Sequence, residues 1–336
     1  MAYRPWGLLD WALQLTTTRQ WSFIGALSTE ERGLAAWHWL SEMGVLLRYR
    51  LLEIVDTPSR HTLRARELLR EREQKFCDAG GRIEHITRSI ELLTELHRIV
   101  AFAREIETAS TGNGSVPGSV ILDITSLPKR FFFPLLRHFE QSKSIRDLVV
   151  TYTSPERYLE GDALSEDATD WLTLPGFHGK DGQSEMLIVS VGFMAESLQN
   201  HLATIKKQEA VKMLIPFPAP LNVLRRTWES VFRLESERPP DKFEHHRVDA
   251  ADLPDAFDRI VSLSREKSAI PAFAPFGPKP ISAAMCLFAS QRQCPVYYPQ
   301  PRIYRPDYSQ GVGEADGKRA VFAYWIKHKG ESLYRI

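Results

Sequence analysis

The chain has 336 residues, 43% of them hydrophobic and 25% charged, which suits two ordinary globular domains better than one. Its 43 lysines and arginines nearly balance its 42 acids, so bulk binding of duplex nucleic acid is disfavoured, because that affinity depends on a basic surface. Its three cysteines lack metal-ligand or CxxC spacing, and no stretch approaches the roughly 20 apolar residues of a membrane span. We therefore expect a cytoplasmic protein with no bound metal and no membrane partner.

The first half alternates short apolar runs with longer amphipathic ones. Residues 1–18 carry tryptophans and leucines and are expected to pack as an arm on the first domain. The expected strands are 21–27, 51–55, 82–87, 119–125 and 147–152. Helices are expected between them, from Ser28 to about Gly44, from Pro58 to Gly80, over 90–109 and over 131–139. Strands and helices alternating at this spacing predict parallel βαβ units.

The second half repeats this order after a polar segment, 159–184, that contains four glycines. Its expected strands are 186–191, 211–216, 244–248, 270–276 and 295–298. One expected helix follows the first strand and ends at 198, and the others cover 222–232, 254–263 and 281–289. A last strand, 319–326, has no counterpart in the first half and is expected at a sheet edge.

The repeat extends to the loops. Strand four of each half leads into a Pro-Lys pair, Pro128-Lys129 and Pro278-Lys279, and strand five leads into the Pro/Arg/Tyr-rich segments 153–158 and 300–308. We therefore predict an α/β fold of two tandem Rossmann-like parallel-sheet halves, related by an internal pseudo-twofold duplication. The predicted domains are 1–158 and 185–336, with 159–184 as the linker.

The Pro-Lys loops are candidate phosphate sites. A helix that follows a parallel strand presents free backbone N–H groups and a partial positive charge, and ligands of such sheets bind at the strands' carboxyl ends. Lys129 and Lys279 would add a point charge there, and the hydroxyls of Thr125 and Ser126 would add hydrogen bonds. The alternative is that proline sets the first helical position and the lysine is only solvated.

The segments after strand five combine guanidinium groups for phosphate with rings for base stacking. The residues concerned are Arg157, Tyr158, Arg302, Tyr304 and Tyr308. Alternatively, these are proline-ordered loops whose tyrosines cover the sheet end. Ser28 and Thr29 after strand one, with Gly192 and Gly277 in the second half, would complete the floor of the sites.

Other ligand classes lack their motifs. Asp56 ends strand two, where Rossmann enzymes place a ribose-binding acid, but no GxGxxG follows strand one, so we expect no NAD and no other cofactor. His245 and His246 lie next to each other on a predicted strand and face opposite sides, so they cannot hold one metal ion.

The loop from Leu122 to Lys129, and less closely that from Phe273 to Lys279, resembles the Thr-Gly-Gly-Thr-Lys loop of CARF-type domains. Those domains are Rossmann-like sensors of cyclic oligonucleotides in prokaryotic antiviral defence, and two fused halves resemble the SAVED variant. Half one lacks the paired glycines and half two keeps only Gly277. The resemblance implies a cyclic-nucleotide ligand.

Three hypotheses follow. The first is a non-catalytic nucleotide sensor or adaptor in a defence complex, with a nucleotide or other phosphorylated small molecule as ligand and a protein effector as partner. The second is a ring-nuclease-like phosphodiesterase, which needs no metal because a 2′-hydroxyl attacks the neighbouring phosphate. The third is a scaffold subunit of a multiprotein complex. Fold class does not choose among them.

Overall fold

The computed structural model describes residues 3–18, 20–111, 118–158, 165–179, 184, 186–192, 210–219, 221–236, 243–265 and 270–336. The chain divides into two compact units. Unit 1 comprises Met1–Leu159 and Arg302–Leu333, and unit 2 comprises Glu160–Pro301 and Tyr334–Ile336. Among the helices described, none is both long and apolar enough to cross a bilayer.

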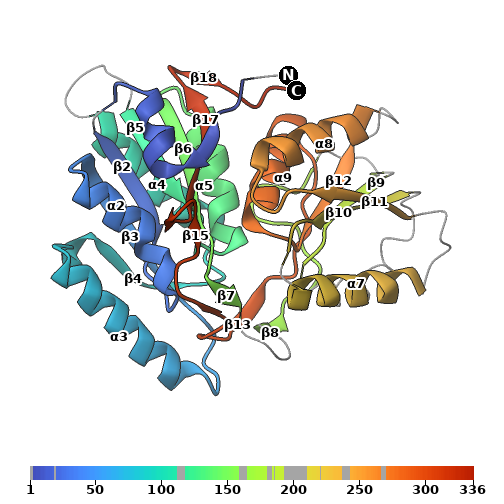
Figure 1. Ribbon diagram of the computed structural model, residues 1–336, viewed down its shortest axis with the longest axis horizontal. Coiled ribbons are helices and arrows are strands. Elements are labelled where there is room, and N and C mark those ends of the chain that lie inside the picture. Colours follow the sequence, from blue (N-terminus) through green and yellow to red (C-terminus); the bar gives the residue numbers. More distant parts are fainter. Residues whose placement is uncertain are drawn as a thin grey trace. The chain divides into compact units, whose positions relative to one another are not determined.

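A mainly parallel sheet forms the centre of unit 1 (Figure 1). Its strands, in spatial order, are β4 (Ile86–Glu91), β3 (Leu46–Val55), β2 (Trp21–Ala26), β5 (Gly118–Asp123), β6 (Ile145–Thr153), β17 (Val321–His328) and β1 (Trp6–Leu8). Those from β4 to β6 are parallel, whereas β17 runs antiparallel to both β6 and β1 and turns back into β18 (Glu331–Ser332). The parallel strands read 3-2-1-4-5 in chain order, the Rossmann-like arrangement, whose switch point lies between β2 and β5.

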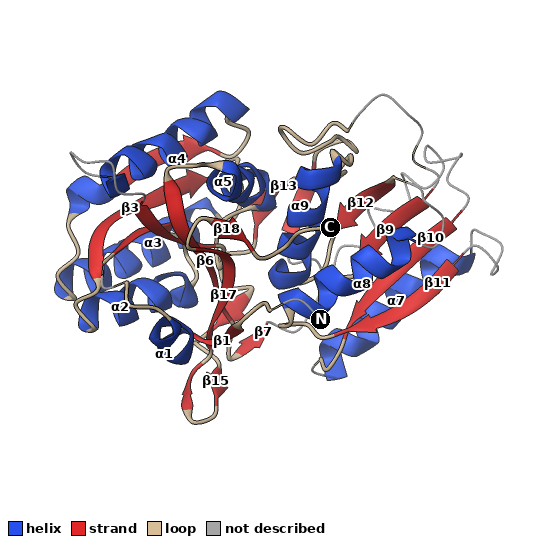
Figure 2. Cartoon of the chain, turned by 90° about the horizontal axis from the view of Figure 1, so that it is seen from above, coloured by secondary structure: helices blue, strands red, loops and turns tan. Residues whose placement is uncertain are grey.

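Helices cover both faces of this sheet (Figure 2). One face carries α4 (Leu96–Thr111) and α5 (Lys129–Gln141), and the other carries α1 (Leu9–Ala12) and α2 (Ala35–Glu42). The remaining elements are α3 (Thr62–Asp78), the 3-10 turns η1 (Leu13–Leu15), η2 (Glu31–Leu34) and η3 (Ile83–His85), and the short strands β7 (Arg157–Tyr158), β13 (Pro301–Tyr304), β14 (Ser309–Gln310), β15 (Glu314–Ala315) and β16 (Lys318–Arg319).

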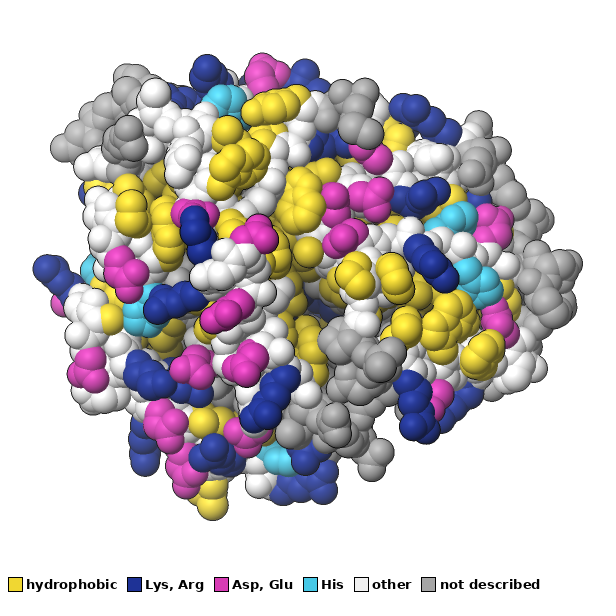
Figure 3. Space-filling model, viewed as in Figure 1, with side chains coloured by type: hydrophobic (Ala, Val, Ile, Leu, Met, Phe, Trp, Pro, Cys, Tyr) yellow, Lys and Arg dark blue, Asp and Glu magenta, His cyan; other side chains and the backbone are white. Residues whose placement is uncertain are grey.

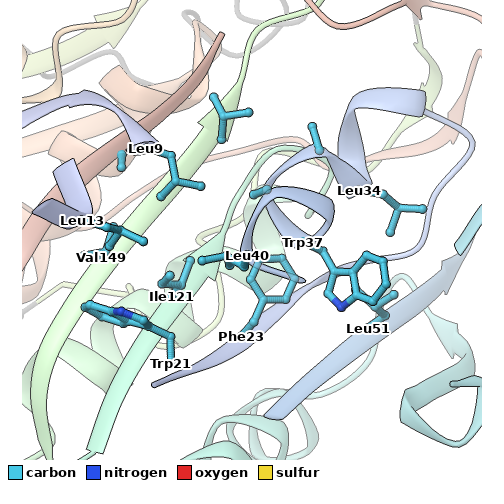
Figure 4. Close-up of a cluster of buried hydrophobic side chains, with 14 of the residues drawn as sticks. Leu9, Leu13, Trp21, Phe23, Leu34, Trp37, Leu40, Leu51, Ile121 and Val149 are labelled. Carbon is cyan, nitrogen blue, oxygen red and sulfur yellow. The ribbon is translucent and has the colours of Figure 1, made fainter. Parts of the chain in front are cut away.

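One hydrophobic cluster of unit 1 lies between β2 and the helices α1 and α2 (Figure 4). Every residue of β2 is buried, as expected of a parallel strand covered on both faces. Phe23 pairs in register with Ile121 of β5, and Trp37 of α2 packs on Phe76 of α3 with ring centroids 4.6 Å apart. Fully burying each such side chain contributes about 1.5–3 kcal/mol, so this cluster fixes β2 and the loop that follows it.

Unit 2 has a smaller parallel sheet. Its strands, in spatial order, are β11 (Phe243–Val248), β10 (Ala210–Pro216), β9 (Met186–Ser190) and β12 (Pro271–Pro275). A parallel bridge from Phe273 to Val296 adds the segment 295–298 beyond β12. Helices α8 (Leu253–Arg265) and α9 (Lys279–Arg292) lie on one side of the strands and α7 (Leu221–Ser236) on the other (Figure 1). Strand β8 (Ser165–Ala168) also belongs to this unit.

The predicted α/β class is confirmed, and the described strands of unit 2 repeat the order 3-2-1-4 of unit 1. Descent of the two units from a duplication stays a prediction. The helix expected to end at residue 198 lies outside the described residues.

The C-terminal strand does not belong to the second half as expected. After Pro301 the chain returns to unit 1, where β17 lies between β6 and β1 instead of at an edge. The physical reason is hydrogen bonding: β17 pairs with β6 over most of its length, from Val321 opposite Thr153 to Lys327 opposite Leu148. The second part of unit 1 is therefore Arg302–Leu333, and the polar segment, which contains β8, is part of unit 2 from Glu160 on.

Candidate ligand-binding edges

The two Pro-Lys loops occupy equivalent places. Lys129 is the first residue of α5 and Lys279 the first of α9, and each follows a proline at the N-cap position. The backbone angles agree, with φ −57° and ψ 149° at Pro128 and φ −52° and ψ 148° at Pro278. The sequence correspondence is therefore also a structural one, except that the proline caps the helix and does not occupy its first position.

A glycine stands against each of these loops. A Cβ added to Gly33, in η2, would lie 2.6 Å from Ser126 Oγ, and one added to Gly192, after β9, would lie 2.2 Å from Phe276 O. Ser126 and Phe276 both stand three residues before the lysine. At Gly192 the neighbouring atom is a backbone carbonyl, so a larger residue there would push the loops after β9 and β12 apart, whereas at Gly33 the Ser126 hydroxyl would have to turn away. The sequence predicts Gly192 at this place but gives no signal for Gly33, an isolated glycine in an apparent helix.

In unit 1 the predicted hydroxyls have different surroundings. Thr125 is fully buried and joins β5 to β6: its Oγ1 donates to Asp123 Oδ1 (2.6 Å) and accepts from Thr153 N (2.9 Å). Ser126 Oγ is buried and makes no hydrogen bond within the described residues. Lys129 is only 8% exposed. Thr125 is thus committed to the sheet, which leaves Ser126 as the available hydroxyl of this loop.

Ser28 and Thr29 form the turn after β2. Ser28 Oγ accepts from Glu30 N (3.2 Å), and Thr29 O accepts from Arg72 on α3 (3.3 Å). A Cβ on Gly33 would lie 3.3 Å from Ser28 Oγ. Ser28 and Ser126 therefore both lie beside Gly33, whereas Thr29 contacts Arg72 through its backbone carbonyl.

The turn after β2 also holds a buried ion pair. Arg32 is 2% exposed; its Nε donates to Glu30 Oε2 (2.7 Å), its Nη1 to Thr153 O (2.7 Å) and its Nη2 to Tyr308 Oη (3.2 Å). Burial alone would lower the pKa of Arg32, but the Glu30 carboxylate raises it well above its ordinary value. This charge is therefore neutralised inside the protein. In the sequence, these residues stand at the start of the helix expected from Ser28 to about Gly44, with no local sign of a buried ion pair.

Residues 302–314, which we call the strap, run over the carboxyl ends of three strands of unit 1. At β3, Thr57 N donates to Arg302 O (3.0 Å) and Tyr304 N to Asp56 Oδ2 (2.9 Å). Burial raises the pKa of Asp56 to about 6, against the opposing effect of that hydrogen bond. Asp56 stands where Rossmann enzymes place a ribose-binding acid, but here its carboxylate accepts a hydrogen bond from the protein's own backbone at Tyr304.

The strap then reaches β2 and β6. The Glu30 carboxylate accepts from Tyr308 Oη (2.7 Å, Oε1) and from Ser309 Oγ (2.6 Å, Oε2). Burial, and then the charge of Glu30, raise the pKa of Tyr308 well above its ordinary value, so the phenol stays protonated and donates. Beyond it, β14 of the strap pairs antiparallel with β7, and Arg157 Nε donates to Gln310 Oε1 (2.9 Å).

The expected equivalence of 153–158 and 300–308 therefore does not hold. Arg157 and Tyr158 form β7, and Tyr158 Oη lies 3.4 Å from Tyr152 Oη. Arg302, Tyr304 and Tyr308 lie in the strap, so they belong to unit 1 rather than to the strand ends of unit 2. The reason is the return of the chain at residue 302, which no local pattern signals. A ligand contact of these residues stays a prediction.

In unit 2 the loops after β9 and β12 meet through backbone. Phe276 N donates to Ser190 O (3.0 Å), and Gly277 N to Ser190 Oγ (3.0 Å). A Cβ on Gly277 would lie 2.8 Å from Val191 O. Lys279 stands two residues after Gly277 and is partly exposed. Gly192 and Gly277 therefore meet at the switch point of unit 2, immediately before the helix that begins with Lys279; a ligand contact of these residues stays a prediction.

Aromatic rings lie beside this loop. The ring of Trp171 is stacked on that of Tyr297 (5.5 Å, 4° between planes) and lies near-parallel to that of Phe276 (6.1 Å, 19°). Trp171 and Tyr297 are partly exposed, while Phe276 is buried. Sequence patterns missed Trp171 because it stands in a polar segment that resembles a linker.

Charge is mixed over the surface. Acidic and basic side chains are interspersed on the face drawn in Figure 3, in keeping with the formal net charge of +1. Within the described ranges, no three His, Cys, Asp or Glu side chains are grouped closely enough to hold a metal ion.

Comparison with solved structures finds distant likenesses, including the following two. A functionally unknown protein from Pseudomonas aeruginosa PAO1 is 13% identical at a TM-score of 0.26, over 85% of this chain and 94% of that one. An N-terminal ketoreductase from a macrolactin assembly line is 12% identical at a TM-score of 0.20, over 73% of this chain and half of that one. No family model and no curated protein matches the sequence. Neither likeness bears on function.

Proposed function

We propose that this protein binds a phosphate-bearing ligand of the nucleotide class at the strand-end loop of unit 2 and acts as a sensor or adaptor without catalysis of its own. The observation that carries the proposal is the meeting of Gly192 and Gly277 at the switch point, immediately before a helix that begins with Lys279. Bare backbone, a helix N-terminus and a cation are the groups that bind a phosphate.

The aromatic rings support a nucleotide over a simple phosphate ester. Trp171 and Tyr297 keep part of their surface exposed within the same loop cluster, and a base stacked on such a ring contributes about 1–3 kcal/mol. The resemblance of the Pro-Lys loops to those of cyclic-oligonucleotide sensors makes cyclic nucleotides the first class to test. It is also the basis for proposing a role in antiviral defence.

The test is a thermal-shift screen of the purified chain against linear and cyclic nucleotides, with products followed by chromatography. We expect a rise in Tm with unchanged ligand, and loss of that rise in Lys279→Ala. Lys143→Ala is the control, because Lys143 is an exposed lysine between α5 and β6 in unit 1. Turnover would replace the sensor by the phosphodiesterase, and no shift with any nucleotide would reject the proposal.

A further inference from the structure

The strap fills the places in unit 1 that a nucleotide takes in a Rossmann-like sheet. Such ligands lie outside the carboxyl ends of the strands, across the switch point, with the ribose held by an acid at the end of strand two. In unit 1 strand one is β2 and strand two is β3. After β3, Asp56 accepts from Tyr304 N, and after β2, Glu30 accepts from Tyr308 and Ser309.

This filling is a close-packed part of the fold. Glu30 and Ser309 are each 6% exposed, and Arg32 is 2% exposed. Farther along the strap, a Cβ on Gly313 would lie 2.9 Å from Pro155 O, and Gly313 N donates to Ser154 O (2.9 Å). Strap backbone therefore lies directly on the backbone that follows β6, with no space for another molecule between them.

The corresponding strand ends of unit 2 are different. After β10, its strand two, Phe217 is 45% exposed, and the guanidinium of Arg247 lies 5.2 Å from the centre of its ring. Arg247 is itself exposed. An exposed ring with a cation over it offers both stacking for a base and charge for a phosphate. The two helix-start lysines show the same contrast between a closed unit 1 and an open unit 2. Lys129 is only 8% exposed, whereas Lys279 is partly exposed.

From this contrast we infer that unit 1 is occupied by its own chain and that the protein binds one nucleotide, on unit 2. The strap takes the place of the ligand in unit 1. The inference rests on the proposed function and adds the stoichiometry and the position of the ligand.

Isothermal titration of the full chain tests the inference, with ATP and cyclic di-AMP as probes beside the best nucleotide of the thermal screen. We expect one site per chain. Lys279→Met should weaken binding roughly 10- to 100-fold, the effect of losing one charge-assisted contact, while the matched Lys129→Met should change Kd less than about twofold on the same scale. Methionine keeps the length of the buried stem, and near-UV circular dichroism checks the fold.

A second measurement needs no variant. Hydrogen exchange followed by mass spectrometry, with and without saturating probe, should show new protection in peptides that contain Gly192, Phe217 or Gly277. Peptides covering 304–310 should stay unchanged. Two sites per chain, or protection in the strap, would overturn the inference and leave the proposed function standing. No heat with any nucleotide would reject the proposed function itself.

Discussion

The buried pair of Glu30 and Arg32 gives the sharpest prediction. The two side chains are 6% and 3% exposed, with 2.6 Å between Arg32 Nη2 and Glu30 Oε2. Removing one partner of a buried pair costs about 3–5 kcal/mol, because the other charge is left uncompensated. Arg32→Met should lower the free energy of unfolding by about 3 kcal/mol, because Glu30 keeps its two hydroxyl donors. Glu30→Gln should lower it by about 4–5 kcal/mol, because the buried guanidinium of Arg32 is left without its counter-charge.

The double variant Glu30→Gln/Arg32→Met leaves neither charge of this buried pair uncompensated. It should therefore lose about 2–3 kcal/mol less than the sum of the single losses. Urea unfolding followed by tryptophan fluorescence measures these free energies and reports mainly on unit 1, which contains six of the eight tryptophans.

The control for this cycle is the exposed pair of Arg88 and Glu73, at 42% and 26% side-chain exposure. Arg88→Met should cost only about 0–1 kcal/mol. If the losses at Glu30 and Arg32 add to within about 0.5 kcal/mol, the two charges are not coupled, and the account of the turn after β2 is wrong.

Three further predictions concern single side chains. Gly192→Ala should destabilise unit 2 by about 2–3 kcal/mol, because its Cβ would stand 2.2 Å from Phe276 O. Gly317→Ala is the control: it has open space around it and should cost only the strain of its positive φ. Calorimetry compares the stability of the two variants. Burial would raise the pKa of Asp147, but its hydrogen bonds, the first from Lys329 N (2.9 Å), lower it overall, so Asp147→Asn should lose about 2–3 kcal/mol at pH 7. That gap should close as pH falls through the depressed folded-state pKa, and a gap independent of pH would contradict the assignment. Tyr308→Phe should cost about 1–2 kcal/mol and speed amide exchange in the strap; an unchanged exchange rate would show that the phenol does not hold it.

Local sequence patterns were enough for the order of the parallel strands and for the Pro-Lys loops. Apolar runs alternating with amphipathic ones predict parallel strands, and in both halves the proline followed by a lysine after a buried strand marks the start of a helix. Lys129 and Lys279 therefore stand at the predicted places. These features depend on neighbours within a few residues, which is the range over which periodicity and capping act.

The strap could not be predicted in this way. Tyr308 donates to Glu30 across 278 positions of sequence, and neither residue carries a local sign of the contact. Glu30 and Arg32 have the composition of an exposed helix start, yet η2 precedes α2 here and both side chains are buried. Whether a charged side chain is buried depends on hydrogen-bonding partners that lie far away in the sequence, and a single sequence does not reveal those partners.

The two Pro-Lys loops show how one local motif is put to two uses by what surrounds it. Counting back from the lysine, Leu127 stands in unit 1 where Gly277 stands in unit 2. Leu127 is fully buried, and in the same loop the Thr125 hydroxyl joins β5 to β6, so both side chains are committed to the interior of unit 1. Gly277 has no side chain to bury and brings bare backbone to the switch point beside Gly192. The contrast between these loops, more than the shared lysine, is why we place the ligand on unit 2.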